Sequence, residues 1–398
     1  MKKLLGSDFG EFLKSYEKEP KRALRFSNKI RSDTKDRLIG EWNLKNVPWT
    51  ENGYYYPSDQ RPGLSVYHDA GVYYIQEPSA MSVAEAAGIK STDAVLDLCA
   101  APGGKTTRAA ELAGFVLGNE IIPSRAKILS SNVERMGISN VIVCSAPVDR
   151  ISDSLGPFFD VVIADAPCSG EGMMRKDETA VKEWSTENVE RCILRQREIL
   201  HHAHLCLKDG GRLVYSTCTF EPEENERQIR SFMKDHPVYL LLNEKTFYPH
   251  LYDGEGQYYA VLQKGEQTGP SETGESERRM KLAERMLTSS GVHILRSGIM
   301  KGETKTDKKK GNIYIPSHAE IMATSFSSHP FENAVNIMKE ETADAFLKGN
   351  QLSAEDGMIF ENDKDCFLGV YYDGYPIGLG KKVGNILKNH LPKGLRRF

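Results

Sequence analysis

Two cysteines of this sequence stand in polar turns, each directly after an apolar segment that reads as a strand. Cys168 lies in DAPCSGEG, three residues after Asp165, and Cys218 lies in YSTCTFEPEEN. A thiol in such a turn adds little to core packing, whereas an ionised thiol is a strong nucleophile. Cys168, Cys218 and Asp165 are therefore candidate catalytic residues. Three other cysteines lie inside strand or helix patterns and fit inert buried thiols: Cys144, Cys192 and Cys206.

A loop of small residues, CAAPGGKTT, lies between a strand pattern and a helix pattern. Backbone N–H groups and the helix N-terminus can approach a ligand there without intervening side chains. The loop ends like a phosphate-binding P-loop, but Cys99 stands where that motif requires glycine, and the adjacent Gly103 and Gly104 do not form a dinucleotide fingerprint. S-adenosylmethionine (SAM) remains as the predicted ligand. Its predicted contacts in the loop are Cys99, Ala100, Ala101, Pro102, Gly103, Gly104 and Lys105.

Acidic residues after the later strand patterns extend the predicted SAM site. Glu120 closes the second strand pattern, where a carboxylate can accept both hydroxyl groups of a ribose. Asp149 follows the third strand pattern and could contact the adenine amino group, but PVDRISD reads as a loop, and a solvated aspartate is an equally good interpretation.

A methyl donor beside a free thiol suits one reaction well. Carbon 5 of cytosine is too electron-poor to attack the methyl group of SAM, but addition of a thiolate to carbon 6 makes carbon 5 nucleophilic. Loss of the carbon-5 proton after methylation then expels the thiolate. The carboxyl group of Asp165 can share a proton with ring nitrogen 3 while the ring is electron-rich. The spacing leaves open whether Cys168 or Cys218 attacks.

An alternation of strand and helix patterns must position these residues. Strands are predicted at 94–98, 115–120, 140–144, 160–166, 211–216, 238–242 and 257–263. Helices are predicted at 105–113, 123–136, 186–207 and 222–235. The alternation predicts an α/β fold with a doubly wound, Rossmann-like sheet over residues 71–264. The candidate residues then fall at the carboxyl ends of its strands, where such sheets bind ligands.

The remainder of the chain divides into three parts. Residues 1–70 form an N-terminal segment whose architecture the sequence leaves open. Residues 265–310 are rich in charged and small polar residues, with one helix-like stretch, and predict a linker. Residues 311–398 return to an apolar pattern that is typical of a small domain, in which MIFEN (358–362) stands out and VGNILKNHL (383–391) looks helical.

Charge is unevenly distributed, although the net charge of the 398 residues is only −3. Residues 21–31 hold five basic and no acidic side chains, and residues 381–398 hold six basic and none acidic. Basic ends of this kind can bind nucleic-acid phosphates, and Lys21, Arg22, Arg25 and the tail are the predicted contacts. The alternative interpretation is that both ends are merely solvated surface.

Composition excludes several classes of protein. A chain of 398 residues is too long for a single small binding module, and it shows no apolar run that could span a membrane. No secretory signal is visible at the start, so a cytoplasmic location without a membrane partner is predicted. The seven cysteines include no C-x-x-C pair, which favours reduced thiols and no bound metal.

The motifs, taken in order, resemble a known family. CAAPGGKTT, NEIIPSRAKILSSNVERMGISNV, FDVVIADAPCSGEGMMRK and GGRLVYSTCTFEPEENE are similar to successive motifs of the NOL/NOP/Sun RNA (cytosine-5) methyltransferases. The resemblance implies that Cys218 is the nucleophile, that Cys168 assists release of the product and that Asp165 lies between methyl donor and base.

The two ends of the chain extend the resemblance. YYDGYPIGLGKKVGNILKNHLPKGLRR resembles the end of the bacterial RsmF-type enzymes, which carry a PUA-like RNA-binding domain, and RALRFSN resembles an RNA-contacting segment of the family. This implies methylation of 16S ribosomal RNA near the decoding site, with ribosomal RNA or the small ribosomal subunit as partner. Two other classes remain as alternatives, a P-loop-like nucleotide hydrolase and a non-catalytic RNA-binding protein with structural cysteines.

Overall fold

The computed structural model describes residues 1–265, 276–307, 311–325, 333–353, 356, 358 and 364–397. The chain divides into two compact units. The large unit comprises Met1–Gln60, Ile75–Ser130 and Asn140–Ser297, and the small unit comprises Arg61–Tyr74, Ser131–Ser139 and Gly298–Phe398.

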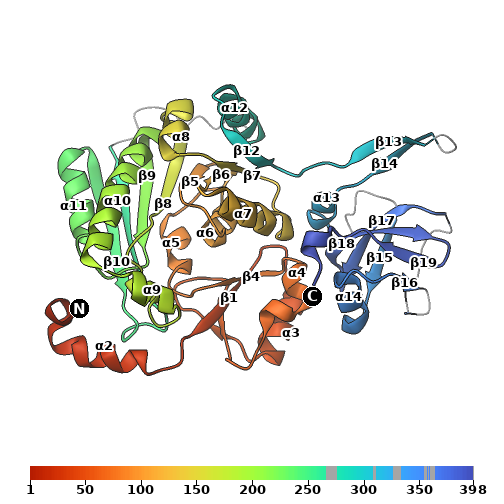
Figure 1. The fold of residues 1–398 in the computed structure, drawn as a ribbon, viewed down its shortest axis with the longest axis horizontal. Helices are drawn as coiled ribbons and strands as arrows, with labels where there is room; N and C mark the ends of the chain where they lie inside the picture. Colours follow the sequence, from red (N-terminus) through yellow and green to blue (C-terminus); the bar gives the residue numbers. More distant parts are fainter. Residues whose placement is uncertain are drawn as a thin grey trace. The chain divides into compact units, whose positions relative to one another are not determined.

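An eight-stranded sheet with the order β10-β11-β9-β8-β5-β6-β7-β12 forms the centre of the large unit (Figure 1). The strands from β9 to β7 are parallel, and antiparallel strands extend both edges. This confirms the predicted α/β sheet. The strands are β5 (Ala94–Asp97), β6 (Phe115–Asn119), β7 (Val141–Ser145), β8 (Phe159–Asp165), β9 (Leu207–Thr217), β10 (Tyr239–Phe247), β11 (Gln257–Lys264) and β12 (His293–Ser297).

Helices cover both faces of this sheet, as Figure 1 shows. One layer shares a single apolar cluster with the strands and consists of α8 (Val148–Leu155), α10 (Thr186–Cys206), α11 (Glu226–Asp235) and α12 (Ser276–Ser289). The other layer consists of α5 (Met81–Ala86), α6 (Gly104–Leu112) and α7 (Pro123–Arg135). Because both faces are covered, the central strands are continuous apolar runs, and Val161, Val162 and Ile163 are all fully buried.

The sheet extends beyond the predicted boundary at residue 264. A linker was expected at 265–310, but α12 packs its apolar side onto the sheet, and β12 pairs with β7 in antiparallel register. The reason lies in the spacing of Met280, Ala283 and Leu287, which places all three on one side of the helix. Residues 266–275 and 308–310 of the predicted linker lie outside the described part of the chain.

Two further local predictions are corrected by the structure. The segment around Asp149, expected to be a loop, forms α8, because Val148, Ile151 and Leu155 meet the core at helical spacing. The segment 383–391, expected to be helical, contains the end of β18 and strand β19, joined by a two-residue turn in which Gly384 has a φ of 57°. Such a turn is typical of a tight hairpin. Most of the MIFEN segment lies outside the described residues.

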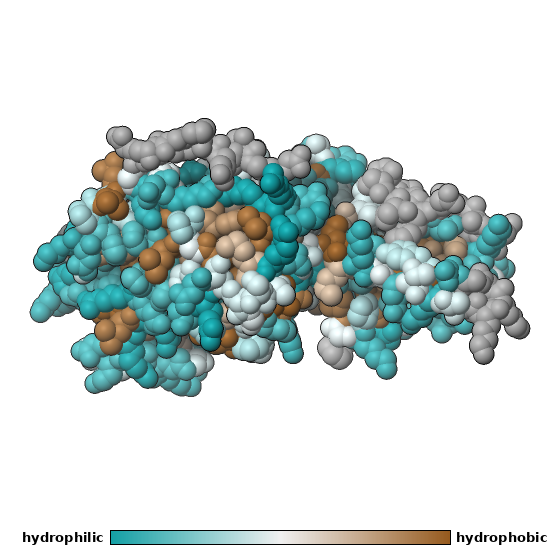
Figure 2. All heavy atoms as spheres, turned by 90° about the horizontal axis from the view of Figure 1, so that it is seen from above, coloured by the Kyte–Doolittle hydropathy of each residue, from teal (hydrophilic) through white to brown (hydrophobic). Residues whose placement is uncertain are grey.

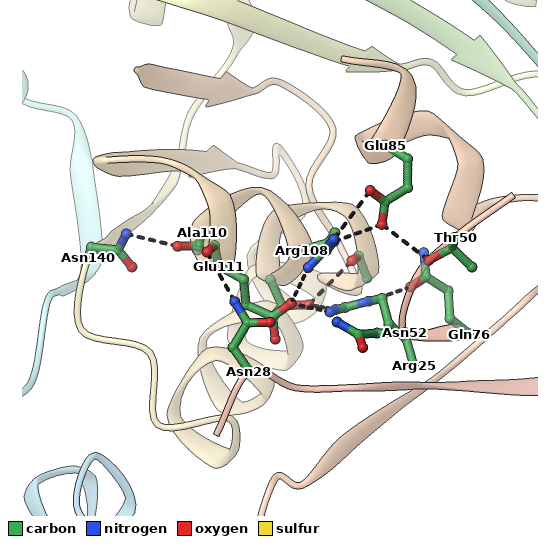
Figure 3. Close-up of polar contacts among 12 residues, drawn as sticks. Arg25, Asn28, Thr50, Asn52, Gln76, Glu85, Arg108, Ala110, Glu111 and Asn140 are labelled. Atoms are coloured by element: carbon green, nitrogen blue, oxygen red, sulfur yellow. Dashed lines mark hydrogen bonds and ion pairs between the residues drawn. The ribbon is translucent and has the colours of Figure 1, made fainter. Parts of the chain in front are cut away.

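The N-terminal part of the chain forms a second sheet with the order β2-β3-β1-β4. Its strands are β1 (Arg22–Phe26), β2 (Lys45–Asn46), β3 (Gly53–Tyr56) and β4 (Tyr73–Gln76), and this part of the chain also contains the helices α1 (Lys2–Leu5), α2 (Phe9–Tyr16) and α3 (Ser32–Glu41). Figure 3 shows how β1 is tied to helix α6 through Arg25. The Arg25 guanidinium lies 2.5 Å from Glu111 Oε2 and donates to the Thr107 hydroxyl at 2.9 Å.

The buried network around Arg25 corrects one prediction. Arg25 is fully buried, and the neighbouring Arg108 donates to both carboxylate oxygens of Glu85, at 2.9 and 3.2 Å. A guanidinium enclosed by these partners is unable to reach a phosphate. The expectation that Arg25 contacts RNA is therefore wrong, whereas Lys21 and Arg22 are exposed.

The small unit contains a five-stranded sheet with the order β15-β17-β18-β19-β16. Its strands are β15 (Ala334–Ile337), β16 (Leu352–Ser353), β17 (Phe367–Tyr372), β18 (Tyr375–Val383) and β19 (Ile386–Asn389). Helices α4 (Val66–Asp69), α13 (His318–Met322) and α14 (Glu340–Leu347) and the hairpin of β13 (Glu303–Asp307) and β14 (Gly311–Ile315) complete the described part of the unit.

Part of the basic tail has a structural role in the small unit. Arg397 donates to Asp69 at 3.1 Å and to Asp344 at 2.7 Å, and Lys382 is buried. These two cations are therefore poor candidates for phosphate contacts, while Lys388 and Lys393 are exposed.

Hydrophilic residues cover most of the face drawn in Figure 2, and apolar residues form small separate groups on it. Of the helices in the described part of the chain, none is long and apolar enough to cross a membrane.

Candidate active site

The predicted site residues meet at one edge of the large sheet. Strands β5, β6, β8 and β9 run parallel, so their carboxyl ends lie at the same edge. The SAM loop follows β5, Glu120 follows β6, Asp165 ends β8, and Cys218 follows β9. Cys168 lies in the turn after β8, before the short helix η3 (Glu171–Met173).

The two candidate cysteines are in direct contact. Their sulfur atoms lie 3.3 Å apart, and both residues are half-buried. The hydrogen bond with Cys218, together with burial, raises the pKa of Cys168 well above its ordinary value. The thiol of Cys168 therefore keeps its proton more readily than an ordinary cysteine does. The other cysteines behave as expected, since Cys144, Cys192 and Cys206 are buried.

Buried polar side chains hold the two cysteine turns together. The Glu224 carboxylate accepts from the Ser169 backbone N–H at 3.1 Å and from the Gln196 amide at 2.7 Å. The hydroxyl groups of Ser169 and Thr219 lie 2.8 Å apart, and the Asn225 amide donates to the Thr219 carbonyl at 2.9 Å. These five residues are all buried, so the turns are fixed rather than free to rearrange. Glu224 was not among the predicted site residues, although it stands in EPEEN at the end of the Cys218 motif YSTCTFEPEEN.

Asp165 links the cysteine turns to the SAM loop. Its Oδ2 accepts from Lys105 Nζ at 2.7 Å, and its Oδ1 accepts from the Ser216 hydroxyl at 2.6 Å and from the Gln257 amide at 3.5 Å. Burial alone would lower the pKa of Lys105, but the Asp165 carboxylate outweighs this and raises it. Lys105 is thus engaged by a carboxylate, whereas the P-loop alternative needs this lysine for a phosphate.

The loop between β5 and α6 fits a ligand that approaches the backbone closely. Gly103 has a φ of 118°, which favours glycine, and it caps the N-terminus of α6. A side chain at Gly118 on the neighbouring strand would come within 3.2 Å of Thr106. The loop is thereby kept clear of side chains at two points. Of its predicted members, Cys99 to Gly103 lie between β5 and α6, and Gly104 and Lys105 are the first two residues of α6.

Asp97 is a site residue that the sequence analysis missed. One carboxylate oxygen accepts from the Thr106 hydroxyl at 2.7 Å, and the other, Oδ1, is buried and has no hydrogen-bond partner among the residues that the structure describes. Burial raises the pKa of Asp97 to about 7. An unpaired buried carboxylate oxygen is costly, and it would be satisfied by an ammonium group such as that of SAM. Its place at the end of β5, just before the small-residue loop, was the available signal.

The two remaining predicted residues differ in their surroundings. Glu120 is buried, lies 3.2 Å from Arg125 and accepts from the Ile122 backbone N–H at 3.0 Å. Asp149 is exposed in the first turn of α8, where it accepts from the Arg150 N–H at 2.7 Å. Both follow carboxyl ends of strands. Their contacts with a cofactor stay predictions.

Metal-binding geometry is not found at this edge. Within the described ranges, no group of three or more histidine, cysteine, aspartate or glutamate residues is placed to hold a metal ion.

Family models match three stretches of the chain. Residues 86–263 match the 16S rRNA methyltransferase RsmB/F, residues 1–78 match the N-terminal domain of 16S rRNA methyltransferase RsmF, and residues 334–397 match the methyltransferase RsmF PUA domain. The first stretch contains every candidate residue of the site.

Solved structures share the fold of the large unit. A methyltransferase homolog from Pyrococcus horikoshii is 28% identical, with a TM-score of 0.59, covering 65% of this chain and 91% of its own. The structure of NSun6 from Pyrococcus horikoshii with SFG has a TM-score of 0.57 at 22% identity, covering 67% of this chain and 97% of its own, and shows the fold alone.

Curated relatives extend over most of the chain. The ribosomal RNA small subunit methyltransferase F of Vibrio cholerae is 31% identical and aligns with 90% of this chain and 86% of its own length. The protein of that name from Escherichia coli O157:H7 is 30% identical over 98% of this chain and 93% of its own. The predicted SAM-dependent methyltransferase domain, its cofactor and the PUA domain are confirmed by these matches. The chain belongs to the family of the ribosomal RNA small subunit methyltransferase F proteins.

Proposed function

We propose that this protein methylates carbon 5 of a cytosine in 16S ribosomal RNA, near the decoding site, through a covalent adduct between Cys218 and carbon 6. The observation that carries the proposal is the pair of sulfur atoms 3.3 Å apart at the ligand-binding edge of the sheet. Methylation of an exocyclic nitrogen or of a ribose hydroxyl has no use for a thiol, whereas carbon 5 has to be activated by one.

The chemistry begins with Cys218. Its thiolate adds to carbon 6, and the electron pair of the carbon 5–carbon 6 double bond becomes available at carbon 5. SAM, when bound, supplies an electrophilic methyl group to carbon 5. A water molecule then takes the carbon-5 proton, and the electron pair of the broken carbon–hydrogen bond restores the double bond and expels the Cys218 thiolate.

Asp165 and Cys168 support these steps in different ways. Asp165 shares a proton with nitrogen 3 of the cytosine, and its contacts with Lys105 and Ser216 hold it in place. Cys168 keeps its own proton because its pKa is raised by the hydrogen bond with Cys218 and by burial. It can therefore donate a hydrogen bond to the Cys218 sulfur as that sulfur leaves carbon 6, and so assist release.

The residues around the small-residue loop fit the methyl donor. The loop from Cys99 to Lys105 would hold it through the backbone, the unpaired oxygen of Asp97 would accept from its amino group, and Glu120 would accept from the ribose hydroxyls. Asp149 remains the candidate for the adenine.

The test is methyl transfer from tritiated SAM to 16S ribosomal RNA extracted from a strain without this protein, followed by digestion to nucleosides. The proposal expects the label in 5-methylcytidine. Label in a nucleoside methylated at an exocyclic nitrogen or at the ribose would refute it. Calorimetric titration adds an independent check, because binding of ATP without binding of SAM would favour the P-loop alternative.

A further inference from the structure

A groove of about 670 Å³ opens on the large unit. It lies among the chain after α2, strand β2, the end of β10 and the loop that follows β10. Basic and aromatic side chains dominate its lining, in particular Lys18, Lys21, Lys45, Lys245, Trp49 and Tyr252.

The lysines of this groove are available for a ligand. Lys18, Lys21 and Lys45 are exposed, and within the described part of the chain they form no ion pair with a carboxylate. Two acidic residues, Glu19 and Asp253, also line the groove. Four lysines against two carboxylates leave a positive balance, which attracts a polyanion.

Aromatic rings accompany the charges. Trp49 and Tyr252 have ring centroids 5.8 Å apart at an interplanar angle of 84°, and Lys245 Nζ lies 4.5 Å from the centroid of the Tyr252 ring. Tyr252 is only half-buried. Proteins bind single-stranded nucleic acid with accessible aromatic rings set between lysines, because the bases stack on the rings while the lysines neutralise the phosphates.

Polar atoms in the groove lack partners. Among the described residues, the Tyr55 hydroxyl and both ring nitrogens of His250 are shielded from solvent and have no hydrogen-bond partner. Such atoms are rare in folded proteins because leaving them unpaired is costly. A nucleobase that entered the groove would bring donors and acceptors to the two side chains, which line it.

Two chain segments connect the groove with the active site. Arg175 lines the groove and lies on the segment that begins with Cys168, and Gly172 of that segment donates its N–H to the Cys218 carbonyl at 2.9 Å. Gly254 also lines the groove, and Gln257, shortly after it, donates to Asp165. The lining of the groove and the active site thus share two short segments of chain, and we expect nucleotides beside the target base to approach the groove along them.

We infer that this groove binds a single-stranded stretch of the substrate RNA beside the target cytosine, with Lys21 and Lys45 on phosphates and a base stacked on Tyr252. The inference rests on the proposed function, because it takes RNA as the substrate. It adds a binding site for the flanking nucleotides that is separate from the site of methyl transfer.

The experiment compares two double variants of the full-length protein. Lys21→Ala with Lys45→Ala removes two exposed lysines from the groove, and Lys90→Ala with Lys234→Ala removes two exposed lysines elsewhere on the large unit. Affinity for a fluorescently labelled single-stranded RNA, taken from the 16S sequence that the wild-type enzyme methylates, is measured by anisotropy over a range of salt concentrations. SAM is omitted, so the result does not depend on the chemistry.

The groove variant should bind this RNA about 20-fold more weakly at 0.1 M salt, and its log–log salt slope should be shallower by about 1.4, because each phosphate contact of a single strand contributes about 0.7. The matched control should stay within about twofold of the wild type. Equal affinity in groove variant and wild type, or an equal loss in both double variants, would overturn the inference.

Stacking is tested separately with Tyr252→Ala. This variant should lose about tenfold in affinity with an unchanged salt slope, because a ring carries no charge. The RNA is also shortened one nucleotide at a time. The affinity of the wild type should fall in a step at the length at which the RNA no longer reaches the groove, and the groove variant should show no such step. A step of equal size in both proteins contradicts the inference.

Failure of this inference is distinguishable from failure of the proposed function. Both double variants should bind SAM with wild-type affinity, and the nucleoside product of the wild-type enzyme is determined independently of RNA affinity. If the product is 5-methylcytidine and the groove variant binds RNA normally, only the groove assignment is wrong. If the product is another nucleoside and the groove variant still binds weakly, only the thiol chemistry is wrong.

Discussion

The sulfur atoms of Cys168 and Cys218 lie 3.3 Å apart, close enough for one hydrogen bond between the two thiols. This hydrogen bond and burial raise the pKa of Cys168, which suits Cys168 to be the donor in the proposed mechanism. At the scale of single residues, geometry therefore supports two different roles for two chemically identical side chains.

Substitution of each cysteine should separate these roles. Cys218→Ala should abolish methyl transfer and leave no covalent protein–RNA species, since nothing else activates carbon 5. Cys168→Ala should still form the adduct but release it slowly, so an RNA-linked band should accumulate on denaturing gels in the presence of SAM. A trapped band in Cys218→Ala and none in Cys168→Ala would reverse the two assignments.

Asp97 should make stability depend on pH. Burial raises its pKa from 3.8 to about 7 in the folded protein, so across this window the folded state holds a proton that the unfolded chain has released. Stability should therefore fall as the pH rises through the window and level off above it. Asp97→Asn keeps an acceptor for the Thr106 hydroxyl but carries no charge. Its free energy of unfolding, relative to that of the wild type, should therefore rise by at least about 1 kcal/mol from about pH 5 to about pH 8.

Urea unfolding of the wild type and Asp97→Asn at the two pH values measures this difference. The exposed Asp153, changed to Asn, is the matched control and should differ from the wild type by the same amount at both pH values. A pH-independent difference for Asp97→Asn contradicts a raised pKa at this position.

At the scale of elements, the SAM loop depends on what holds helix α6. The loop leads into this helix, and strand β1 is tied to it through Arg25, which contacts Thr107 and Glu111 (Figure 3). The N-terminal segment is thus joined to the element that begins at the cofactor site, and its central arginine is a structural residue.

Arg25→Met should destabilise the protein by about 3 kcal/mol, because it leaves the carboxylate of Glu111 buried with one ionic partner fewer. Arg22→Met, on the same strand but exposed, should stay within about 0.5 kcal/mol of the wild type. Urea unfolding of both variants measures the difference. Equal stability of the two variants would mean that the buried network contributes nothing.

At the scale of the whole molecule, the chain combines a large unit that holds the thiols with a small unit that ends in a basic tail. The tail divides into cations with structural partners, such as Arg397, and exposed cations such as Lys388 and Lys393. Only the exposed ones can release counterions from RNA, so the salt dependence of binding should follow them.

Lys388→Gln with Lys393→Gln should weaken binding to 16S ribosomal RNA and make the log–log salt slope shallower by about 1.4 to 1.8. A control pair, Lys301→Gln with Lys339→Gln, removes the same charge from exposed positions of the small unit outside the tail. Anisotropy at several salt concentrations measures both slopes. If the two pairs shift the slope equally, the tail is solvated surface without a special role.

The sequence by itself determined the types of the reacting residues and the edge at which they meet. Cys168, Cys218, Asp165 and the small-residue loop each follow a strand pattern, and parallel strands joined by helices present their carboxyl ends at one edge. Local patterns were therefore sufficient for the parallel strands of the sheet and for the edge at which the candidate residues lie. Where they were misread, as at α8 and at the hairpin around Gly384, the signal was present in the spacing of apolar residues or in the turn residues.

Only the tertiary structure decided what each charged or polar side chain contacts. Lys105 meets Asp165 across 60 positions of sequence, and Arg25 meets Glu111 across 86. Strand β12 joins the sheet beside β7, far from it in the chain. A single sequence shows that a residue carries charge, but burial and distance determine whether that charge binds a ligand or stabilises the fold. Both depend on packing between segments that sequence separation does not reveal.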